Sequence, residues 1–261
     1  MNQTILLEIK DNIATITLNR PQAMNTYNLE LAEALAEATE QVKNDATVRA
    51  VLLRGNGPMF MAGGDIHFFG KHIDAMAHHV PVMMKFVKQT IINLSTMPKP
   101  VLASVHGSAA GIGISFLAAV DFVLVTDSTK FTLAYGALGI TPDGGASYFL
   151  PRLVGTRKAL EMAVFAELFD AQTAKDMGLV NWVVPEAELT AATEKRLHKL
   201  ANGPTQAFIE AKRLMHASWQ HDLVTQLEEE EKSFTHCAQS NDFKAGVTAF
   251  IKKRKPSFNG R

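Results

Sequence analysis

The chain opens with alternating apolar and polar residues and then changes to a helical period. Residues 5–9 and 13–18 alternate on either side of Lys10-Asp11-Asn12, a pattern that predicts a β-hairpin. After Asn28, a good N-cap residue, apolar side chains recur at helical spacing, which predicts an amphipathic helix. A short buried strand is expected at residues 50–54, just before a turn rich in glycine and proline.

Strands and helices continue to about residue 155, and helices dominate after it. Strands are expected at residues 101–105, 122–126, 130–134 and 180–184, and helices at residues 82–94, 115–119, from 146, 159–165, 171–177, 186–201, 205–216 and 223–253. This order predicts an α/β protein with a recurring strand, strand, helix unit. We expect a core over residues 1–200 and a C-terminal helical region over residues 201–261, joined as an annex of one domain.

The composition narrows the class of protein. Apolar residues make up 47% and charged residues 20% of the chain, which is typical of a soluble globular enzyme. Lys plus Arg number 26 and Asp plus Glu number 26, and this balance argues against nucleic acid as the main partner. The one cysteine, Cys237, forms no internal disulfide, and the N-terminus shows no secretory signal, so we expect a cytoplasmic protein.

Two segments suggest a membrane protein and a metalloprotein, but both are better explained as ordinary parts of a globular fold. The uncharged run between Lys99 and Asp121 approaches the length of a membrane span, but glycines and a histidine interrupt it. We interpret it as a buried strand, a Gly/Ala turn and a buried helix, and expect no membrane partner. Residues 65–81 hold four histidines without the spacing of a metal site, so we predict short helices or a mobile loop and no metal.

Two glycine-rich turns could carry chemistry. The glycines at 107, 111 and 113 lead into an apolar helix, whose free N–H groups could bind an oxyanion, although tight packing explains the glycines as well. Asp143 lies between a proline and two glycines, with apolar residues on both sides. A carboxylate in such surroundings could be a general acid/base. The local pattern equally allows Asp143 to be the N-cap of the helix from residue 146.

Five motifs occur together and in order: FMAGGDI, HGSAAGIGIS, LGITPDGGASYFLPRLVG, AKDMGLVNWVV and GVTAFIKKRKPSF. With the opening LNRP segment, they resemble the enoyl-CoA hydratase/isomerase (crotonase) superfamily over essentially the whole chain. The Pro-Asp-Gly-Gly segment and the C-terminal tail most resemble its 2-(1,2-epoxy-1,2-dihydrophenyl)acetyl-CoA isomerase group. The resemblance implies a spiral of ββα units with a C-terminal helical region that forms trimers, often paired as hexamers.

The resemblance also implies a site for acyl-CoA thioesters. The backbone N–H groups of Gly64 and Ile112 would hold the thioester oxygen in an oxyanion hole. Hydratases of this family carry two glutamates, and their positions here hold Ser115 and Tyr135. Asp143 is then the carboxylate that the family pattern leaves to move a proton, and Tyr135 would be a wall of the acyl pocket.

The expected function is therefore isomerisation of an unsaturated acyl-CoA by proton transfer through an enolate. The alternatives are an enoyl-CoA hydratase, a hydrolase like 4-chlorobenzoyl-CoA dehalogenase, and a non-catalytic acyl-CoA binder. Dehalogenases use a histidine on the helix before residues 99–101, and the spacing places Lys88 at that position. A dehalogenase is therefore less favoured than an isomerase.

Coenzyme A would be part of the substrate, and no separate cofactor is expected. By resemblance, its contacts come from the backbone around residues 23–24, from the turn at residues 62–66, and from two residues that reach across from a neighbouring subunit. The residues implied are Ala23, Met24, Ala62, Gly63, Asp65, Ile66, Phe250 and Lys253.

Overall fold

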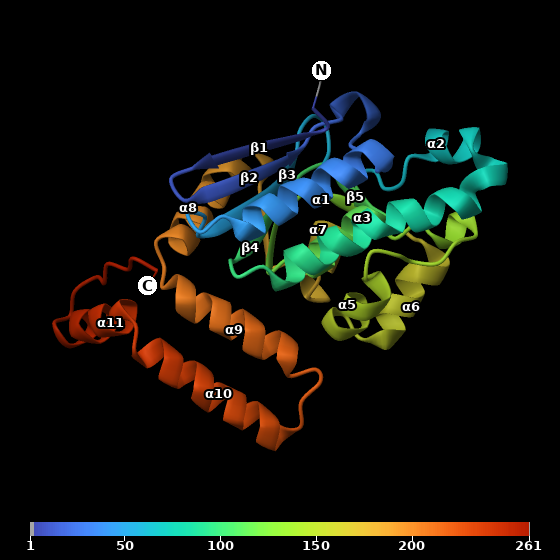
Figure 1. Ribbon diagram of the computed structural model, residues 1–261. Helices are drawn as coiled ribbons and strands as arrows, with labels where there is room; N and C mark the ends of the chain where they lie inside the picture. Colours follow the sequence, from blue (N-terminus) through green and yellow to red (C-terminus); the bar gives the residue numbers. More distant parts are fainter. Residues whose placement is uncertain (1–2, 261) are drawn as a thin grey trace.

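The computed structural model describes residues 3–260 and contains two β-sheets surrounded by helices (Figure 1). The larger sheet has the strand order β1-β2-β3-β4-β6-β9. Its strands are β1 (Ile5–Lys10), β2 (Ile13–Leu18), β3 (Ala50–Gly55), β4 (Val101–Val105), β6 (Phe122–Thr126) and β9 (Trp182–Val184). Strands β1 and β2 form the predicted antiparallel hairpin, and every other neighbouring pair in this sheet is parallel. The parallel strands are mostly buried, which explains their continuous apolar sequences.

The smaller sheet has the order β5-β7-β8, with strands β5 (Ser108–Ala110), β7 (Lys130–Thr132) and β8 (Phe169–Asp170). Strands β5 and β7 are parallel, with Ala109 opposite Phe131. The pattern of the sequence did not predict β5 or β8, because two or three residues are too short to show an alternation. This sheet matters for the site because Gly111 follows directly after β5.

The helices are α1 (Leu29–Asn44), α2 (Ile66–Lys71), α3 (Met76–Thr96), α4 (Ile112–Ala119), α5 (Ala146–Leu153), α6 (Thr156–Phe165), α7 (Ala171–Asp176), α8 (Leu189–Ala201), α9 (Thr205–Ala217), α10 (Leu223–Ala238) and α11 (Asn241–Ile251). Helices α1 and α3 lie side by side (Figure 1). The predicted N-cap of α1 is confirmed, since Asn28 Oδ1 accepts from Leu31 N–H at 3.0 Å. All eight residues of α4 are buried, so this helix is part of the core.

Several predicted boundaries are wrong, and three of them bear on the fold. Helix α3 begins at Met76 and not at residue 82, with Pro81 inside it, because packing along α1 outweighs the loss of one backbone hydrogen bond. Helix α4 begins at Ile112 and not at residue 115. The stretch 223–253 is two helices, because Ser240 Oγ accepts from Phe243 N–H at 3.0 Å and starts α11.

The uncharged run and the histidine-rich segment form the elements predicted for them. The run folds as β4, β5 and α4, and none of the helices within residues 3–260 is long and apolar enough to cross a membrane. Residues 65–81 form α2, a 3₁₀ turn at Ile73–Ala75 and the beginning of α3. His72 and His79 stack with Phe68 there.

A buried ion pair attaches the C-terminal region to the core. Lys212 of α9 contacts the carboxylate of Asp121, at the start of β6, at 2.9 Å. Burial raises the pKa of Asp121 and lowers the pKa of Lys212, and their mutual attraction opposes both shifts. Helices α10 and α11 extend from α9 away from the sheets (Figure 1).

Candidate active site

Tyr27 joins the N-terminal segment to the glycine turn at residues 63–64. Its N–H donates to Gly63 O at 2.8 Å, and its carbonyl accepts from Asp65 N–H at 3.1 Å. This short parallel pairing uses the residues on either side of Gly64 and leaves the N–H of Gly64 out of the pairing. The turn is therefore fixed by backbone bonds while one of its donors stays available.

The glycine turn at residues 63–64 packs directly against the start of α4. A Cβ atom on Gly63 would lie 3.3 Å from Ala110 O, and one on Gly111 would lie 3.5 Å from Gly63 Cα. Both glycines also have positive φ angles, +96° and +51°. The two turns predicted from the motifs thus lie backbone against backbone, an approach that side chains at these positions would obstruct.

Each turn contributes one N–H group that is not engaged. The N–H groups of Gly64 and Ile112 have no acceptor within residues 3–260. Ile112 is the first residue of α4, where a helix leaves its N–H groups unpaired and its dipole favours negative charge. Two such donors from facing turns form a suitable binding site for an oxygen atom that gains negative charge.

Asp143 is held by Tyr135 and Ser115, the two residues that the resemblance aligned with glutamates. Its Oδ1 accepts a hydrogen bond from the Tyr135 hydroxyl. Its backbone carbonyl accepts from Ser115 Oγ at 2.8 Å. Tyr135, which we expected only as a pocket wall, therefore directs its hydroxyl at the carboxylate.

The interpretation of Asp143 as a helix cap is wrong. Gly145 occupies the N-cap position of α5, and no side chain caps this end of the helix. Gly144 and Gly145 have φ angles of +58° and +79°, and a Cβ on Gly144 would lie 2.9 Å from Ser115 Cβ. The two glycines let the chain turn tightly against α4, so that the Asp143 side chain faces Tyr135 instead of the helix.

The surroundings of Asp143 make it a stronger base than an exposed aspartate. Burial raises the pKa of its carboxyl, and the hydrogen bond from Tyr135 offsets part of that rise. Burial and the negative charge of Asp143 in turn raise the pKa of Tyr135 well above its usual range, so Tyr135 stays protonated as a donor. A partly buried carboxylate with a raised pKa suits proton abstraction near neutral pH.

The predicted coenzyme A contacts fall into two groups in the protomer. Residues 23–24 lie beside the glycine turn, because Ala62 N–H donates to Met24 O at 3.0 Å. Met24 and Ile66 are about half exposed, at 47% and 50%, and flank this turn at the surface. Together with Ala62 and Gly63, they offer backbone and apolar contacts beside the oxyanion donors.

Asp65 is engaged within the protein. It caps α2, accepting from Phe68 N–H at 3.1 Å, and it pairs with Arg20 at 3.1 Å. Burial opposes ionisation, but these hydrogen bonds hold the pKa of Asp65 below its usual range. Asp65 therefore shapes the turn, and its carboxylate is already occupied.

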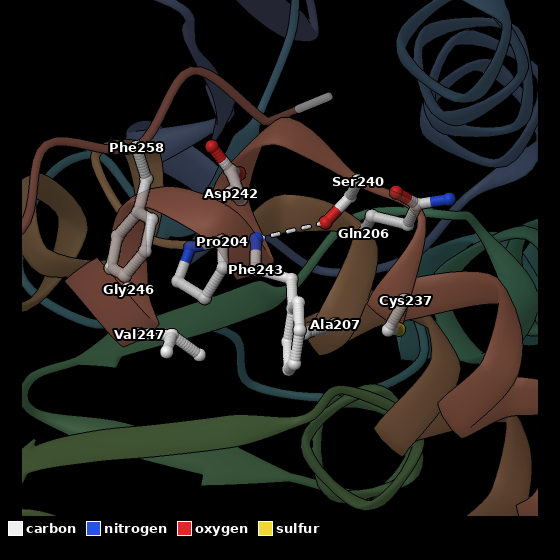
Figure 2. A pocket seen from close by; sticks show the side chains of 10 residues that line it. All are labelled: Pro204, Gln206, Ala207, Cys237, Ser240, Asp242, Phe243, Gly246, Val247 and Phe258. Carbon is white, nitrogen blue, oxygen red and sulfur yellow. Dashed lines mark hydrogen bonds between the residues drawn. The ribbon is translucent and has the colours of Figure 1, made fainter.

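Phe250 and Lys253 are not brought to the site within one protomer. Both are exposed, Phe250 on α11 and Lys253 just after it, and α11 and α2 lie at opposite ends of the molecule (Figure 1). A separate apolar cavity of about 240 Å³ lies among α9, α10, α11 and Phe258 (Figure 2). It contains none of the residues predicted for the site.

The sequence pattern missed two buried hydroxyl groups that are unpaired within the described part of the chain. One belongs to Tyr27, in the segment after LNRP, which senses the charge of Asp143, and the other to Thr90 on α3, which lies beside Tyr27. Both residues look like ordinary core positions in the sequence, and no motif marks either one.

Comparisons with known proteins identify the family of this chain. A family model described as enoyl-CoA hydratase/isomerase matches residues 8–261. The chain belongs to the enoyl-CoA hydratase/isomerase family. Its structural neighbours share the crotonase fold, and the family acts on acyl-CoA thioesters.

Individual relatives carry both activities in their names. A protein of Rhodobacter capsulatus named "Probable enoyl-CoA hydratase" is 36% identical over 99% of this chain and 98% of its own length. The 1,2-epoxyphenylacetyl-CoA isomerase of Escherichia coli is 34% identical over the full length of both chains. The crystal structure of an enoyl-CoA hydratase from Bacillus anthracis superposes with a TM-score of 0.92 at 30% identity, covering 99% of this chain and all of the other.

Proposed function

We propose that this member of the family is an acyl-CoA isomerase that moves a carbon–carbon double bond of an unsaturated acyl-CoA thioester. The observation that carries the proposal is the combination of the raised pKa of Asp143 and its two hydrogen-bond donors. Asp143 is the carboxylate at the site, and Tyr135 and Ser115 both hydrogen-bond to it. Both positions where hydratases carry glutamates are thus used to hold one base.

The mechanism follows from this geometry. Asp143 removes a proton from C2 or C4 of the acyl chain, and the electron pair shifts toward the thioester carbonyl. The N–H groups of Gly64 and Ile112 stabilise the enolate oxygen, and the dipole of α4 adds to this. The protonated Asp143 then returns the proton to the other carbon of the three-carbon system, so one base completes the 1,3-shift.

Two other activities fit the site less well. A hydratase is considered because the Rhodobacter relative is named as one. Such an enzyme orients a water molecule between two side chains, but here Ser115 and Tyr135 are both hydrogen-bonded to Asp143. A dehalogenase would need a base from α3, where Lys88 is exposed to solvent.

A pair of substrates separates the candidates. The purified protein is incubated with a 3-enoyl-CoA and, separately, with crotonyl-CoA, and ultraviolet absorbance of the conjugated thioester is followed. We expect absorbance to rise with the 3-enoyl-CoA, as the double bond moves into conjugation, and to stay constant with crotonyl-CoA. A fall of absorbance with crotonyl-CoA would identify a hydratase, and silence with both would favour a binder.

Tyr135→Phe tests the hydrogen bond that tunes the base. The Tyr135 hydroxyl lowers the pKa of Asp143, so its loss should raise that pKa further. Because the base acts in its ionised form, kcat/KM falls as the pH falls through this pKa. The acid limb of the pH–rate profile should therefore move to higher pH in the variant, and Tyr148→Phe, an exposed tyrosine, serves as the control. An unchanged acid limb would remove Tyr135 from this role.

We also propose that the active form is an oligomer, a trimer or a pair of trimers. Several large apolar side chains of the C-terminal helices are exposed: Leu223, Val224, Leu227, Phe234, Phe250 and Ile251. Exposed apolar surface of this extent is typical of an interface. A neighbouring copy would then bring Phe250 and Lys253 to the coenzyme A. Sedimentation velocity gives the mass, and a fully active monomer would contradict the proposal.

A further inference from the structure

Two buried hydroxyl groups near Asp143 have no hydrogen-bond partner. The Tyr27 and Thr90 side chains are 2% and 0% exposed, and neither hydroxyl is paired within residues 3–260. Elsewhere in the protein, buried side-chain polar atoms nearly always find a partner, because an unpaired one loses its hydration without compensation. Two buried hydroxyl groups without a hydrogen-bond partner therefore suggest that a ligand supplies the partner.

Both hydroxyls belong to residues fixed around the proposed site. The backbone of Tyr27 pairs with the turn that contains Gly64, and its ring packs edge-on against Phe116 of α4 at 5.6 Å between ring centroids. Thr90 is followed on α3 by Ile91, whose Cγ2 would lie 3.4 Å from a Cβ on Gly145, two residues after Asp143. The oxyanion turn and the Asp143 turn are thus each in contact with one of these elements.

The two hydroxyls also lie near one another and near the base. Burial and then the negative charge of Asp143 raise the pKa of Tyr27, and the nearby Thr90 hydroxyl acts in the opposite direction. No hydrogen bond of acceptable geometry joins the two hydroxyls within residues 3–260. Phe116, against which the Tyr27 ring packs, and Ile91 and Leu94, which flank Thr90 along α3, are buried apolar residues.

We propose that the hydroxyls of Tyr27 and Thr90 bind one oxygen atom carried by the acyl group, so that this enzyme prefers oxygenated acyl-CoA thioesters over plain hydrocarbon ones. The inference rests on the proposed function, since it assumes that the acyl group lies beside Asp143. A hydroxyl, carbonyl or epoxide oxygen could accept from both groups. A plain chain leaves the pair unsatisfied, and a site built around hydrogen-bond donors rejects such an analogue.

Binding of saturated thioesters tests this without any reaction. Dissociation constants are measured by titration calorimetry for hexanoyl-CoA and for four hexanoyl-CoA derivatives that carry a hydroxyl on carbon 3, 4, 5 or 6. In the unmodified protein we expect at least one derivative to bind about 10- to 100-fold more tightly than hexanoyl-CoA. In Tyr27→Phe and Thr90→Val this preference should disappear, while Thr90→Ser, which keeps the hydroxyl, should retain it. Equal affinity for all five thioesters, or a preference that survives in both hydroxyl-free variants, overturns the proposal.

A stability measurement on the free protein is the second arm. Tyr27→Phe and Thr90→Val remove hydroxyls that have no partner, so neither should lower the midpoint of thermal unfolding. A clear fall in both variants would show that the hydroxyls are already paired, and would overturn the proposal. Both measurements use unreactive ligands or none, so they are independent of the isomerase assay. A protein without isomerase activity could still show the binding preference, and an active isomerase could lack it.

Discussion

Asp143→Asn is expected to lower kcat for double-bond migration by about 10²- to 10⁴-fold, the range that a positioned general base contributes. Asparagine has nearly the same shape and can still accept from the Tyr135 hydroxyl, so the turn should keep its form. The dissociation constant of a saturated acyl-CoA should change little, because the oxyanion donors come from other turns. Turnover of a 3-enoyl-CoA and calorimetric binding of its saturated analogue provide the two measurements.

The matched control is Asp127→Asn, which neutralises an exposed aspartate on the turn after β6. It should leave both turnover and binding unchanged. If Asp143→Asn turned over at the rate of the unmodified enzyme, another group would have to be the base, and the proposed mechanism would be wrong.

The same substitution should make the protein more stable at neutral pH. Burial raises the pKa of Asp143, so the folded state binds this proton more tightly than the unfolded state does. Stability then falls as the pH rises from the unfolded pKa of about 3.9 through the raised value, and stays lower above it. Asparagine has no such dependence. The urea midpoint of the variant should exceed that of the unmodified protein at neutral pH, and the difference should shrink in acid.

Ile112→Pro is expected to lower kcat by about 10²- to 10³-fold, the loss typical when one oxyanion donor is removed. Proline lacks the N–H group, and it is tolerated at the first position of a helix, which Ile112 occupies in α4. The loss should fall mainly on kcat, because the donor acts most strongly on the charge that develops in the transition state.

Ile112→Val is the control for this change. It keeps the N–H and shortens the buried side chain by one methylene, so its turnover should stay near that of the unmodified enzyme. Circular dichroism establishes that both variants keep their helices. Equal turnover in Ile112→Pro and Ile112→Val would exclude the Ile112 N–H from the oxyanion hole.

Elements whose signal is local were predicted well from the sequence. Asp11 and Asn12 adopt positive φ angles at the hairpin turn, which these two residue types tolerate better than most others. Asn28 caps α1 through a bond to a residue three positions away. The buried strands after residue 50 and residue 100 could be read from their continuous apolar runs.

Elements that depend on a distant neighbour were not predicted. Strands β5 and β8 exist because β7 lies beside both, and neither could be seen in two or three residues. The helix expected from residue 82 begins six residues earlier, and α3 continues through Pro81 where it lies along α1.

For the site, the sequence by itself determined the family, the two glycine turns and the aspartate that we propose as the base. Those follow from residue types and their order along the chain. Only the tertiary structure decided that Asp143 faces Tyr135 instead of capping α5, and that Ser115, 28 positions away, holds its backbone. It also brought the unpaired hydroxyls of Tyr27 and Thr90 to the same place. The physical reason is that a cap or a turn is closed by bonds between residues a few positions apart, whereas the charge state and partners of a buried group depend on which distant segments pack around it.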